Sequence, residues 1–351
     1  MSDSALLPCI RQPKKDGASA PLPCSIQPSG PASPGWPIRG RLRVHLRIVN
    51  VELILMVSAV RRRRSLTIPP ALAAACRNVP EREAWLARLP DTLRDLEHRW
   101  SLTFSPPFDG AGTGCAWVAP VVLAAGPSAV LKLGMPHMEG EHEIEGLRFW
   151  NGEPTVRLLD ADVGLGAMLL ERCEPGTALH SLPEPEQDVV IARLLRGLWR
   201  VPVAPHPFRP LSAMIAHWSR ETLAQAEHWR DEGLVREGLS VFKELLQGAA
   251  AHVLLATDLH AGNVLRAQRR PWLVIDPKPF VGDPAYDATQ HLRNCGGRLH
   301  ADPDGTIRRF ADRLGVDHVR VRLWMFARIA AEPRDDWDSD AAADLARALA
   351  V

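Results

Sequence analysis

The sequence predicts an α+β fold with two lobes: a small N-terminal lobe with an antiparallel sheet and one key helix, and a larger, mostly helical C-terminal lobe. Two observations predict it. Short β-prone runs separated by glycines fill residues 101–134, as in an antiparallel sheet. After Pro183, apolar residues recur at helical spacing in segment after segment, interrupted by one compact strand-loop-strand at 253–276. We therefore place the small lobe at 66–172 and the large lobe at 173–351.

The individual elements follow from the same periodicities. A helix is expected at 80–100, where Trp85, Leu89 and Leu93 keep helical spacing. Apolar and β-prone runs predict strands at 115–122, 129–133 and 168–170. Further helices are predicted at 138–150, 184–200, 211–231, 234–251, 284–295, 317–331 and 338–349. One of these helices, 138–150, thus lies within the small lobe and the others build the large one.

Composition and cysteine usage are those of a soluble globular protein. The 351 residues are 46% hydrophobic and 24% charged, both ordinary values. The longest apolar run, 48–60, is shorter than the roughly 18 residues of a membrane span and contains Asn50 and Glu52, so no membrane partner is expected. The six cysteines form neither a C-x-x-C pair nor a zinc-ligand spacing. We expect a cytoplasmic location with free thiols.

Residues 1–65 are expected to form a disordered, basic extension outside the catalytic fold. Residues 1–40 hold eight prolines and four glycines, a composition typical of disorder. Residues 1–70 carry eleven basic and three acidic side chains, a net charge of +8, which leaves −7 on the remainder. A non-native upstream start would also explain the extension, because Met56 lies just before the coherent part. A nucleic-acid-binding arm is less favoured, since Trp36 is its only aromatic residue, and no nucleic-acid partner is expected.

The most informative stretch contains two apolar runs that each lead to a carboxylate. The run 254–256 leads to Asp258, Asn263 follows five residues later, and the run 272–275 ends at Asp276. Carboxylates at the ends of buried strands are costly unless they meet a cation or a donor. Oxygen ligands at Asn263 and Asp276 suit Mg²⁺, and Asp258 can accept a proton from an attacking hydroxyl. This is the D-x-x-x-x-N…D arrangement of a kinase-like catalytic loop; a β-hairpin with an Asx-capped loop is the alternative.

A lysine inside an apolar strand predicts a phosphate contact. Lys132 lies in the run Ala-Val-Leu-Lys-Leu, and lysine is rarely buried without a partner. It can place a point charge on the phosphates of ATP, or it can guard an edge strand. On the following helix, Glu143 shares a stripe with Leu147 and Trp150 and faces inward, whereas Glu141 falls on the polar side. We therefore expect a Lys132–Glu143 ion pair.

Two glycines and the lobe junction complete the predicted nucleotide site. Gly112 and Gly114 belong to a G-x-G-x-G run between two strands, where the backbone can approach phosphates closely. A plain hairpin turn would have the same sequence. No Walker-type G-x-x-x-x-G-K-[ST] occurs, which argues against a P-loop kinase. Adenine is expected to bind backbone groups at the junction, around Glu171 and Cys173.

These motifs resemble the aminoglycoside phosphotransferase family, and within it the aminoglycoside 6-phosphotransferases (streptomycin 6-kinases), grouped with the aminoglycoside/hydroxyurea resistance kinases. The likeness extends from about residue 67 to the C-terminus. Its most specific element is Asp276-Pro277-Lys278-Pro279, in place of D-F-G. The other segments that carry it are 131–143, 147–150, 169–176, 258–265 and 275–284.

The resemblance implies a bilobed protein-kinase-like fold and ATP-dependent O-phosphorylation of a small-molecule aminoglycoside, at the 6-hydroxyl of streptomycin. By position, Asp258 would be the base, Asn263 and Asp276 the Mg²⁺ ligands, and Lys132 the phosphate clamp. Another cationic acceptor or hydroxyurea is an alternative acceptor for the same fold. A nucleotide-binding pseudokinase is a further alternative, disfavoured because these four residues are intact.

Two features of the site remain open at this stage. The family commonly begins its catalytic loop with H-G-D, whereas Ala256-Thr257 precede Asp258 here, so the support of the loop is not evident. The acidic body would attract a cationic substrate, although a solvated acidic surface carries the same charge. The candidate substrate carboxylates are Asp283, Asp287, Asp335 and Asp336. As alternatives, Asp283 could brace the catalytic loop, Asp287 could stabilise the helix at 284–295, and the last two could be loop or helix-capping acids.

Overall fold

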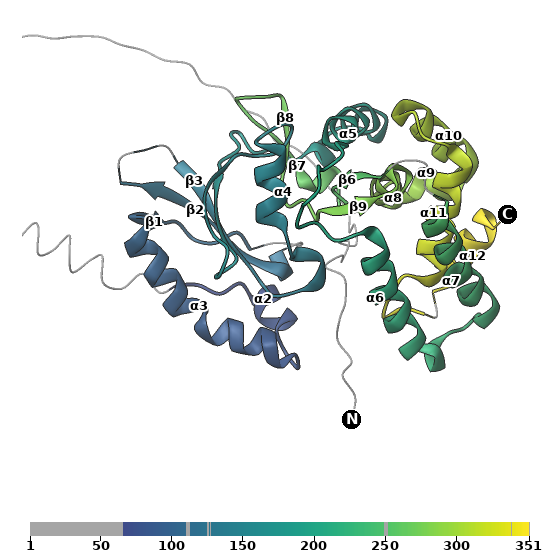
Figure 1. Cartoon of the computed structure of the whole chain (residues 1–351), viewed down its shortest axis with the longest axis horizontal. Helices are drawn as coiled ribbons and strands as arrows, with labels where there is room; N and C mark the ends of the chain where they lie inside the picture. Colours follow the sequence, from purple (N-terminus) through teal and green to yellow (C-terminus); the bar gives the residue numbers. More distant parts are fainter. Residues whose placement is uncertain are drawn as a thin grey trace, which may run out of the picture. The chain divides into compact units, whose positions relative to one another are not determined.

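The computed structural model describes residues 66–109, 113–124, 126, 128–248, 252–337 and 339–350. The predicted extension at 1–65 and the predicted phosphate-loop residue Gly112 lie outside the described residues. Residues 68–351 fall within one compact unit. In Figure 1 the strands of its sheet and the long helices of its C-terminal part occupy different sides of this unit.

The small lobe is built on a five-stranded antiparallel sheet in the order β1-β2-β3-β5-β4. Lys132 lies in the central strand, opposite Val118 of one neighbour and Met168 of the other. The three predicted strands are confirmed to within one residue at each end. The strands are β1 (Leu102–Phe104), β2 (Ala116–Leu123), β3 (Ser128–Gly134), β4 (Leu158–Asp162) and β5 (Ala167–Glu171).

Three helices accompany this sheet. After the short α2 (Pro70–Ala75), α3 (Pro80–Arg99) buries the predicted stripe and contacts β1. The helix predicted at 138–150 is split: a 3-10 turn covers Met138–Gly140, and α4 covers Glu143–Trp150. The backbone of His142 between them is left-handed, with φ of 65°. The 3-10 turn before α4 therefore does not continue the axis of that helix.

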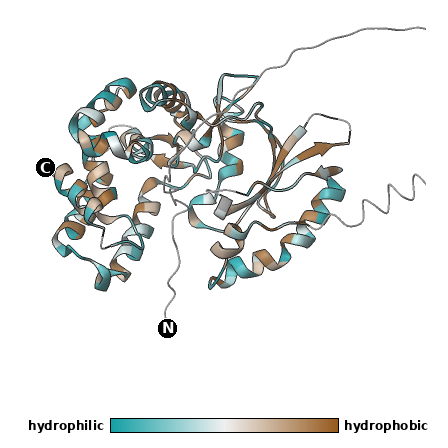
Figure 2. Ribbon diagram, turned by 180° about the vertical axis from the view of Figure 1, so that it is seen from behind, coloured by the Kyte–Doolittle hydropathy of each residue, from teal (hydrophilic) through white to brown (hydrophobic). Residues whose placement is uncertain are grey.

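The large lobe consists of helices around a buried α11, which contacts α7, α8, α10 and α12. Figure 2 shows hydrophobic and hydrophilic residues on different sides of several of these helices, as burial of one face requires. The predicted helix at 211–231 ends at Ala224, and α9 and α10 were not predicted. The helices are α5 (Glu184–Leu198), α6 (Leu211–Ala224), α7 (Glu232–Gln247), α8 (Pro284–Asn294), α9 (Gly296–Ala301), α10 (Pro303–Leu314), α11 (His318–Ala331) and α12 (Asp340–Leu349).

Two small two-stranded sheets lie between α7 and α8 in the chain and carry the catalytic loop. β6 (Val253–Leu255) pairs with β9 (Phe280–Gly282), and β7 (Val264–Arg266) pairs with β8 (Trp272–Val274). The strands before Asp258 and Asp276, β6 and β8, are therefore not paired with each other. It is the β7–β8 hairpin that brings the segment of Asp276 back to the catalytic loop.

The predicted α+β, two-lobed fold class is confirmed. Among the described residues, no helix is both long and apolar enough to cross a bilayer. Cys76, Cys173 and Cys295 are buried free thiols. Cys115 is disulfide-bonded, so the expectation of free thiols throughout is wrong at this position.

Candidate active site

The catalytic loop turns sharply immediately after β6. Thr257 adopts a left-handed backbone, with φ of 43°, and the Asp258 N–H donates back to the Ala256 carbonyl at 2.6 Å. A β-branched residue in this region is strained and needs surroundings that enforce it. The Thr257 hydroxyl donates to the Lys278 carbonyl at 2.7 Å, and the Lys278 N–H donates to Ala256 at 2.9 Å. The loop is thus fastened to the segment after Asp276.

Asp287 supports the backbone of the catalytic loop at Ala256 and Thr257. Its carboxylate, which is 1% exposed, accepts from the N–H groups of Thr257 at 2.8 Å and Ala256 at 3.1 Å. The indole of Trp199 donates to it at 3.0 Å. Burial raises the pKa of Asp287 to about 6, although these three donors oppose the shift. Two backbone donors of the strained turn are thus fixed by Asp287, and a third donor, from Trp199, holds the Asp287 carboxylate in place.

The structure corrects the two buried substrate candidates. Asp287 braces the loop and does not face a ligand, because its oxygens are taken up by protein donors. Asp283 caps α8 by accepting from the Ala285 N–H at 3.0 Å, and it also accepts from Trp324 at 2.7 Å and from Arg320. The alternative roles expected for the two residues are therefore exchanged: Asp287 braces the loop, and Asp283 stabilises the helix. Asp335 and Asp336 are exposed in the connection between α11 and α12.

Asp258 is partly exposed, and each of its carboxylate oxygens has a different environment. Oδ1 accepts from the Gln290 amide at 2.7 Å. Oδ2 has only a long contact, 3.5 Å, with the Asn263 amide nitrogen, which donates to the Asp258 carbonyl at 3.0 Å. Burial raises the pKa of Asp258 to about 6, against the opposing charge of Lys278. The carboxylate is thus ionised at neutral pH and offers one oxygen to a hydroxyl.

Asn263 and Asp276 lie at the same end of the β7–β8 hairpin. The Ile275 N–H donates to the Asn263 carbonyl at 2.9 Å, which places Asp276 one residue beyond this pair. Because the Asn263 amide nitrogen is turned toward Asp258, the amide oxygen is the atom left for a cation. A carboxylate and an amide oxygen at one hairpin end form a hard-oxygen donor set, which fits Mg²⁺.

Two lysines meet the Asp276 carboxylate. Lys132, which is 6% exposed, donates to both oxygens of Glu143 at 2.6 Å and to Asp276 Oδ1 at 2.5 Å. Lys278 also donates to that oxygen. Burial would raise the pKa of Asp276, but the two lysines outweigh it and hold that pKa well below its usual range. The predicted Lys132–Glu143 ion pair is present; the contact of Lys278 was not foreseen.

At the lobe junction, Glu171 is bound by neighbouring donors. Glu171 ends β5 and accepts from Arg269 at 2.9 Å and from the Arg157 N–H at 3.0 Å. Burial would raise the pKa of Glu171, but the hydrogen bonds from Arg269 lower it. Burial raises the pKa of the Cys173 thiol to about 11. Gly114 lies in the 3-10 turn that leads into β2. Side chains at the junction are thus occupied, and a ligand there would meet backbone groups.

The sequence reasoning missed two glutamates, one that interacts with the base and a second that interacts with the first. Glu139, in the 3-10 turn before α4, accepts from the Trp218 indole at 3.0 Å. Burial and then Asp258 raise the pKa of Glu139 to about 7. Glu221 of α6 follows the same pattern, because burial and then Glu139 raise its pKa to about 7. Trp218 and Glu221 share one face of α6 at i and i+3. This shared face is the only sequence pattern that could have indicated that Glu221 points inward.

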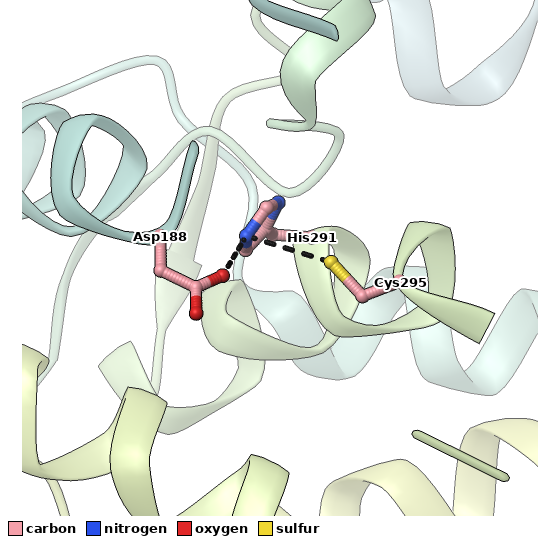
Figure 3. Close-up of side chains that lie close together, drawn as sticks. All are labelled: Asp188, His291 and Cys295. Carbon is pink, nitrogen blue, oxygen red and sulfur yellow. Dashed lines mark hydrogen bonds and ion pairs between the residues drawn. The ribbon is translucent and has the colours of Figure 1, made fainter. Parts of the chain in front are cut away.

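A cluster of metal-ligand residue types elsewhere is not a metal site. Asp188, His291 and Cys295 lie together, with His291 2.8 Å from Asp188 and 3.7 Å from Cys295 (Figure 3). Arg298 donates to both Asp188 oxygens at 2.8 Å, so a cation would meet a permanent positive charge. Burial also raises the pKa of the Cys295 thiol to about 11, which keeps it protonated. The cluster ties α5 to α8 and α9.

The two-lobed fold and the site at its catalytic loop define a protein-kinase-like phosphotransferase. Residues 99–334 match the aminoglycoside/hydroxyurea antibiotic resistance kinases. The chain belongs to this family of kinases.

Two relatives and one solved structure give the extent of the likeness. The streptomycin 6-kinase of Streptomyces glaucescens is 37% identical over 291 residues, which cover 79% of this chain and 92% of that protein. The hydroxyurea phosphotransferase of Kitasatospora aureofaciens is 35% identical over 247 residues, 69% of this chain and 71% of that protein. The choline kinase LicA of Streptococcus pneumoniae has the same fold, with a TM-score of 0.53 and 14% identity over 74% of this chain and 99% of that one.

Proposed function

We propose that the chain transfers the γ-phosphoryl group of ATP to the 6-hydroxyl of streptomycin and thereby inactivates the antibiotic. The observation that carries the proposal is the meeting of Lys132, Glu143 and Asp276 beside the loop that holds Asp258. A charge-paired lysine and two oxygen ligands suit the phosphates of a nucleotide, and the neighbouring carboxylate suits an attacking hydroxyl. Because ATP is a cytoplasmic co-substrate, we place the reaction in the cytoplasm.

The phosphate end of the site prepares the transferred group. Asn263 and Asp276 would hold Mg²⁺, which neutralises charge on the β- and γ-phosphates. Lys132 would bind the phosphates and is kept in place by Glu143. Gly114, in the turn before β2, would cover the nucleotide, and Glu171 and Cys173 would provide backbone groups for adenine. The residues of this end thus bind and orient the nucleotide.

Asp258 performs the proton transfer. Its Oδ2 would accept the proton as the substrate O–H bond breaks and the new O–P bond forms, while the bond from the γ-phosphorus to the bridging oxygen breaks and ADP leaves. Since the transition state is loose, orientation of the hydroxyl contributes more than basicity. The support of the loop by Asp287 serves this orientation.

The acceptor is expected to be a cation. Streptomycin carries two guanidinium groups and an amine, each of which can meet a carboxylate. Among the described residues, Glu139 forms no ion pair with a protein cation, and its carboxylate is next to the base. Glu139 is therefore a carboxylate we propose for these contacts, together with Glu221, whose carboxylate lies 3.2 Å from His217 Nε2. Hydroxyurea, the alternative acceptor, is neutral and would leave both without a counter-charge.

The proposal is tested by following ADP release from the purified chain with Mg-ATP. Streptomycin should stimulate release far above the rates with hydroxyurea, with kanamycin or without acceptor. Phosphorus and proton NMR of the product should place the phosphate on the 6-oxygen. Equal rates with hydroxyurea, or no stimulation by streptomycin, would refute this acceptor.

A further inference from the structure

Gln290 of α8 links the proposed base to a buried charge network. The side chain is 2% exposed; its amide nitrogen donates to Asp258 Oδ1 at 2.7 Å, and its oxygen accepts from Arg328 at 2.9 Å. Arginine has donors only, so the amide oxygen must face Arg328 and the NH₂ group must face Asp258. The chemistry of the two neighbours therefore fixes the orientation of the amide.

Arg328 is itself fixed on every side. Its guanidinium, 2% exposed with the rest of the residue, donates to Thr289 Oγ1 at 2.7 Å and to Glu332 at 2.8 Å. It also lies over the rings of Trp218 and Tyr286, 5.5 Å and 4.9 Å from their centroids. Buried, satisfied networks of this kind are rigid. Gln290 thus transmits the position of a rigid group to the catalytic loop.

An amide is well suited to this position. It donates one hydrogen bond to Asp258, yet it brings no charge that would compete with the substrate hydroxyl or a cation. Because the Gln290 amide binds Oδ1, it opposes rotation of the Asp258 carboxylate. The other oxygen, Oδ2, then lies on the side of Asn263, whose amide nitrogen makes only a 3.5 Å contact with it. If the Gln290 donor were removed and not replaced, Asp258 would lose a charge-assisted hydrogen bond.

We propose that Gln290 is a positioning residue for phosphoryl transfer, which sets the rotation of the Asp258 carboxylate so that a single oxygen faces the acceptor hydroxyl. The inference rests on the proposed role of Asp258. It concerns orientation of the bound hydroxyl and not the binding of either substrate. The effect of its loss should therefore appear in kcat and not in KM.

The test compares Gln290→Glu with Thr289→Val. Glutamate keeps the size of Gln290 and still accepts from Arg328, but it offers no donor to an ionised Asp258. We expect kcat with Mg-ATP and streptomycin to fall about 10- to 100-fold, with both KM values within about threefold of the parent chain. Thr289→Val removes the neighbouring, equally buried acceptor of Arg328 and leaves the Gln290–Asp258 bond, so its kcat should stay within about twofold.

Melting temperatures of both variants separate positioning from folding. Gln290→Leu, which removes all polar atoms, should lose kcat as Gln290→Glu does. The proposal is overturned if Gln290→Glu retains kcat within about threefold, or if its loss of activity appears in KM. It is also overturned if Thr289→Val loses activity to the degree that its melting temperature falls. The role of Asp258 is tested separately: Asp258→Ala with near-normal turnover would refute the proposed function itself, whereas an inactive Asp258→Ala beside an active Gln290→Glu would refute only this inference.

Discussion

The two ends of the site handle charge in opposite ways. At the phosphate end, Lys132 binds both Glu143 and Asp276, Lys278 also binds Asp276, and the pKa of Asp276 is held well below its usual range. At the acceptor end, Asp258 and Glu139 are held by neutral donors, Gln290 and a tryptophan indole, and burial raises their pKa values to about 6 and about 7. The carboxylates of the first end have protein cations as partners, whereas in the proposed function those of the second would receive a cation from the acceptor.

This difference teaches where affinity for a cationic acceptor can come from. Carboxylates that are desolvated without a counter-charge gain free energy when a guanidinium replaces the missing partner. The paired carboxylates near Lys132 gain little, because their charge is already compensated. The net charge of the remainder of the chain matters less than these few positions.

The largest expected effect is that of Asp258→Ala, which removes the base from the acceptor end. We expect kcat to fall at least ~100-fold, the lower range for a positioned base. The affinity for ATP, measured by calorimetry, should change little, because the phosphate end keeps its lysines. Near-normal turnover of Asp258→Ala would show that the acceptor end does not supply the base, and would contradict the division of roles between the two ends.

A smaller effect is expected from Glu139→Gln, which keeps an acceptor for the Trp218 indole but removes the charge. KM for streptomycin should rise about tenfold, as expected for one charge-assisted contact, while KM for ATP stays unchanged. Glu237→Gln on the exposed face of α7 is the matched control, since it makes the same change in net charge. Equal effects of the two variants would show that only the overall charge matters.

The pH dependence should distinguish the two ends in the parent chain. Glu139 and Glu221, with pKa values of about 7, lose their charge as the pH falls, so attraction for a cation weakens. Loss of the Glu139 charge alone should raise KM for streptomycin about fourfold from pH 8 to pH 6.5, whereas KM for ATP should change less because Asp276 stays ionised. Glu139→Gln should flatten this rise. A rise of the same size in that variant would exclude Glu139 as its cause.

The smallest effect is expected when residues 1–55 are deleted. This segment carries most of the predicted basic extension, and we expect no contribution to either end of the site. KM for streptomycin and the melting temperature should stay within measurement error in kinetic and calorimetric assays. A lower KM after deletion would mean that the basic segment neutralises the acceptor end. Loss of soluble protein would show that the extension belongs to the fold.

Much of the fold could be predicted because local patterns decide it. Apolar and β-prone runs located β2, β3 and β5 within one residue, and one apolar stripe was enough to choose Glu143 over Glu141 as the partner of Lys132. α10 was missed although its buried residues keep helical spacing, because Asp-Pro and Asp-Gly at its start read as turn signals. Local signals failed where a proline and glycine introduce a helix.

The parts of the site that could not be predicted depend on contacts between distant segments. Asp283 and Asp287 are four residues apart, and only the packing of α8 decides that the second one meets the loop at Ala256 and Thr257. Gln290 and Glu139 carry no motif at all, since their partners are 32 and 79 residues away. Motifs identify the groups that react, and tertiary packing selects the groups that orient them.

α8 binds three different parts of the molecule within five residues. Asp287 holds the backbone of the strained turn, Gln290 holds the base, and His291 contacts Asp188 of α5. A displacement of α8 would therefore move the turn at Thr257 and the carboxylate of Asp258 together. Substitutions on the far side, at the α5 and α9 contacts, are therefore a route by which turnover can be altered without touching any group that meets a substrate.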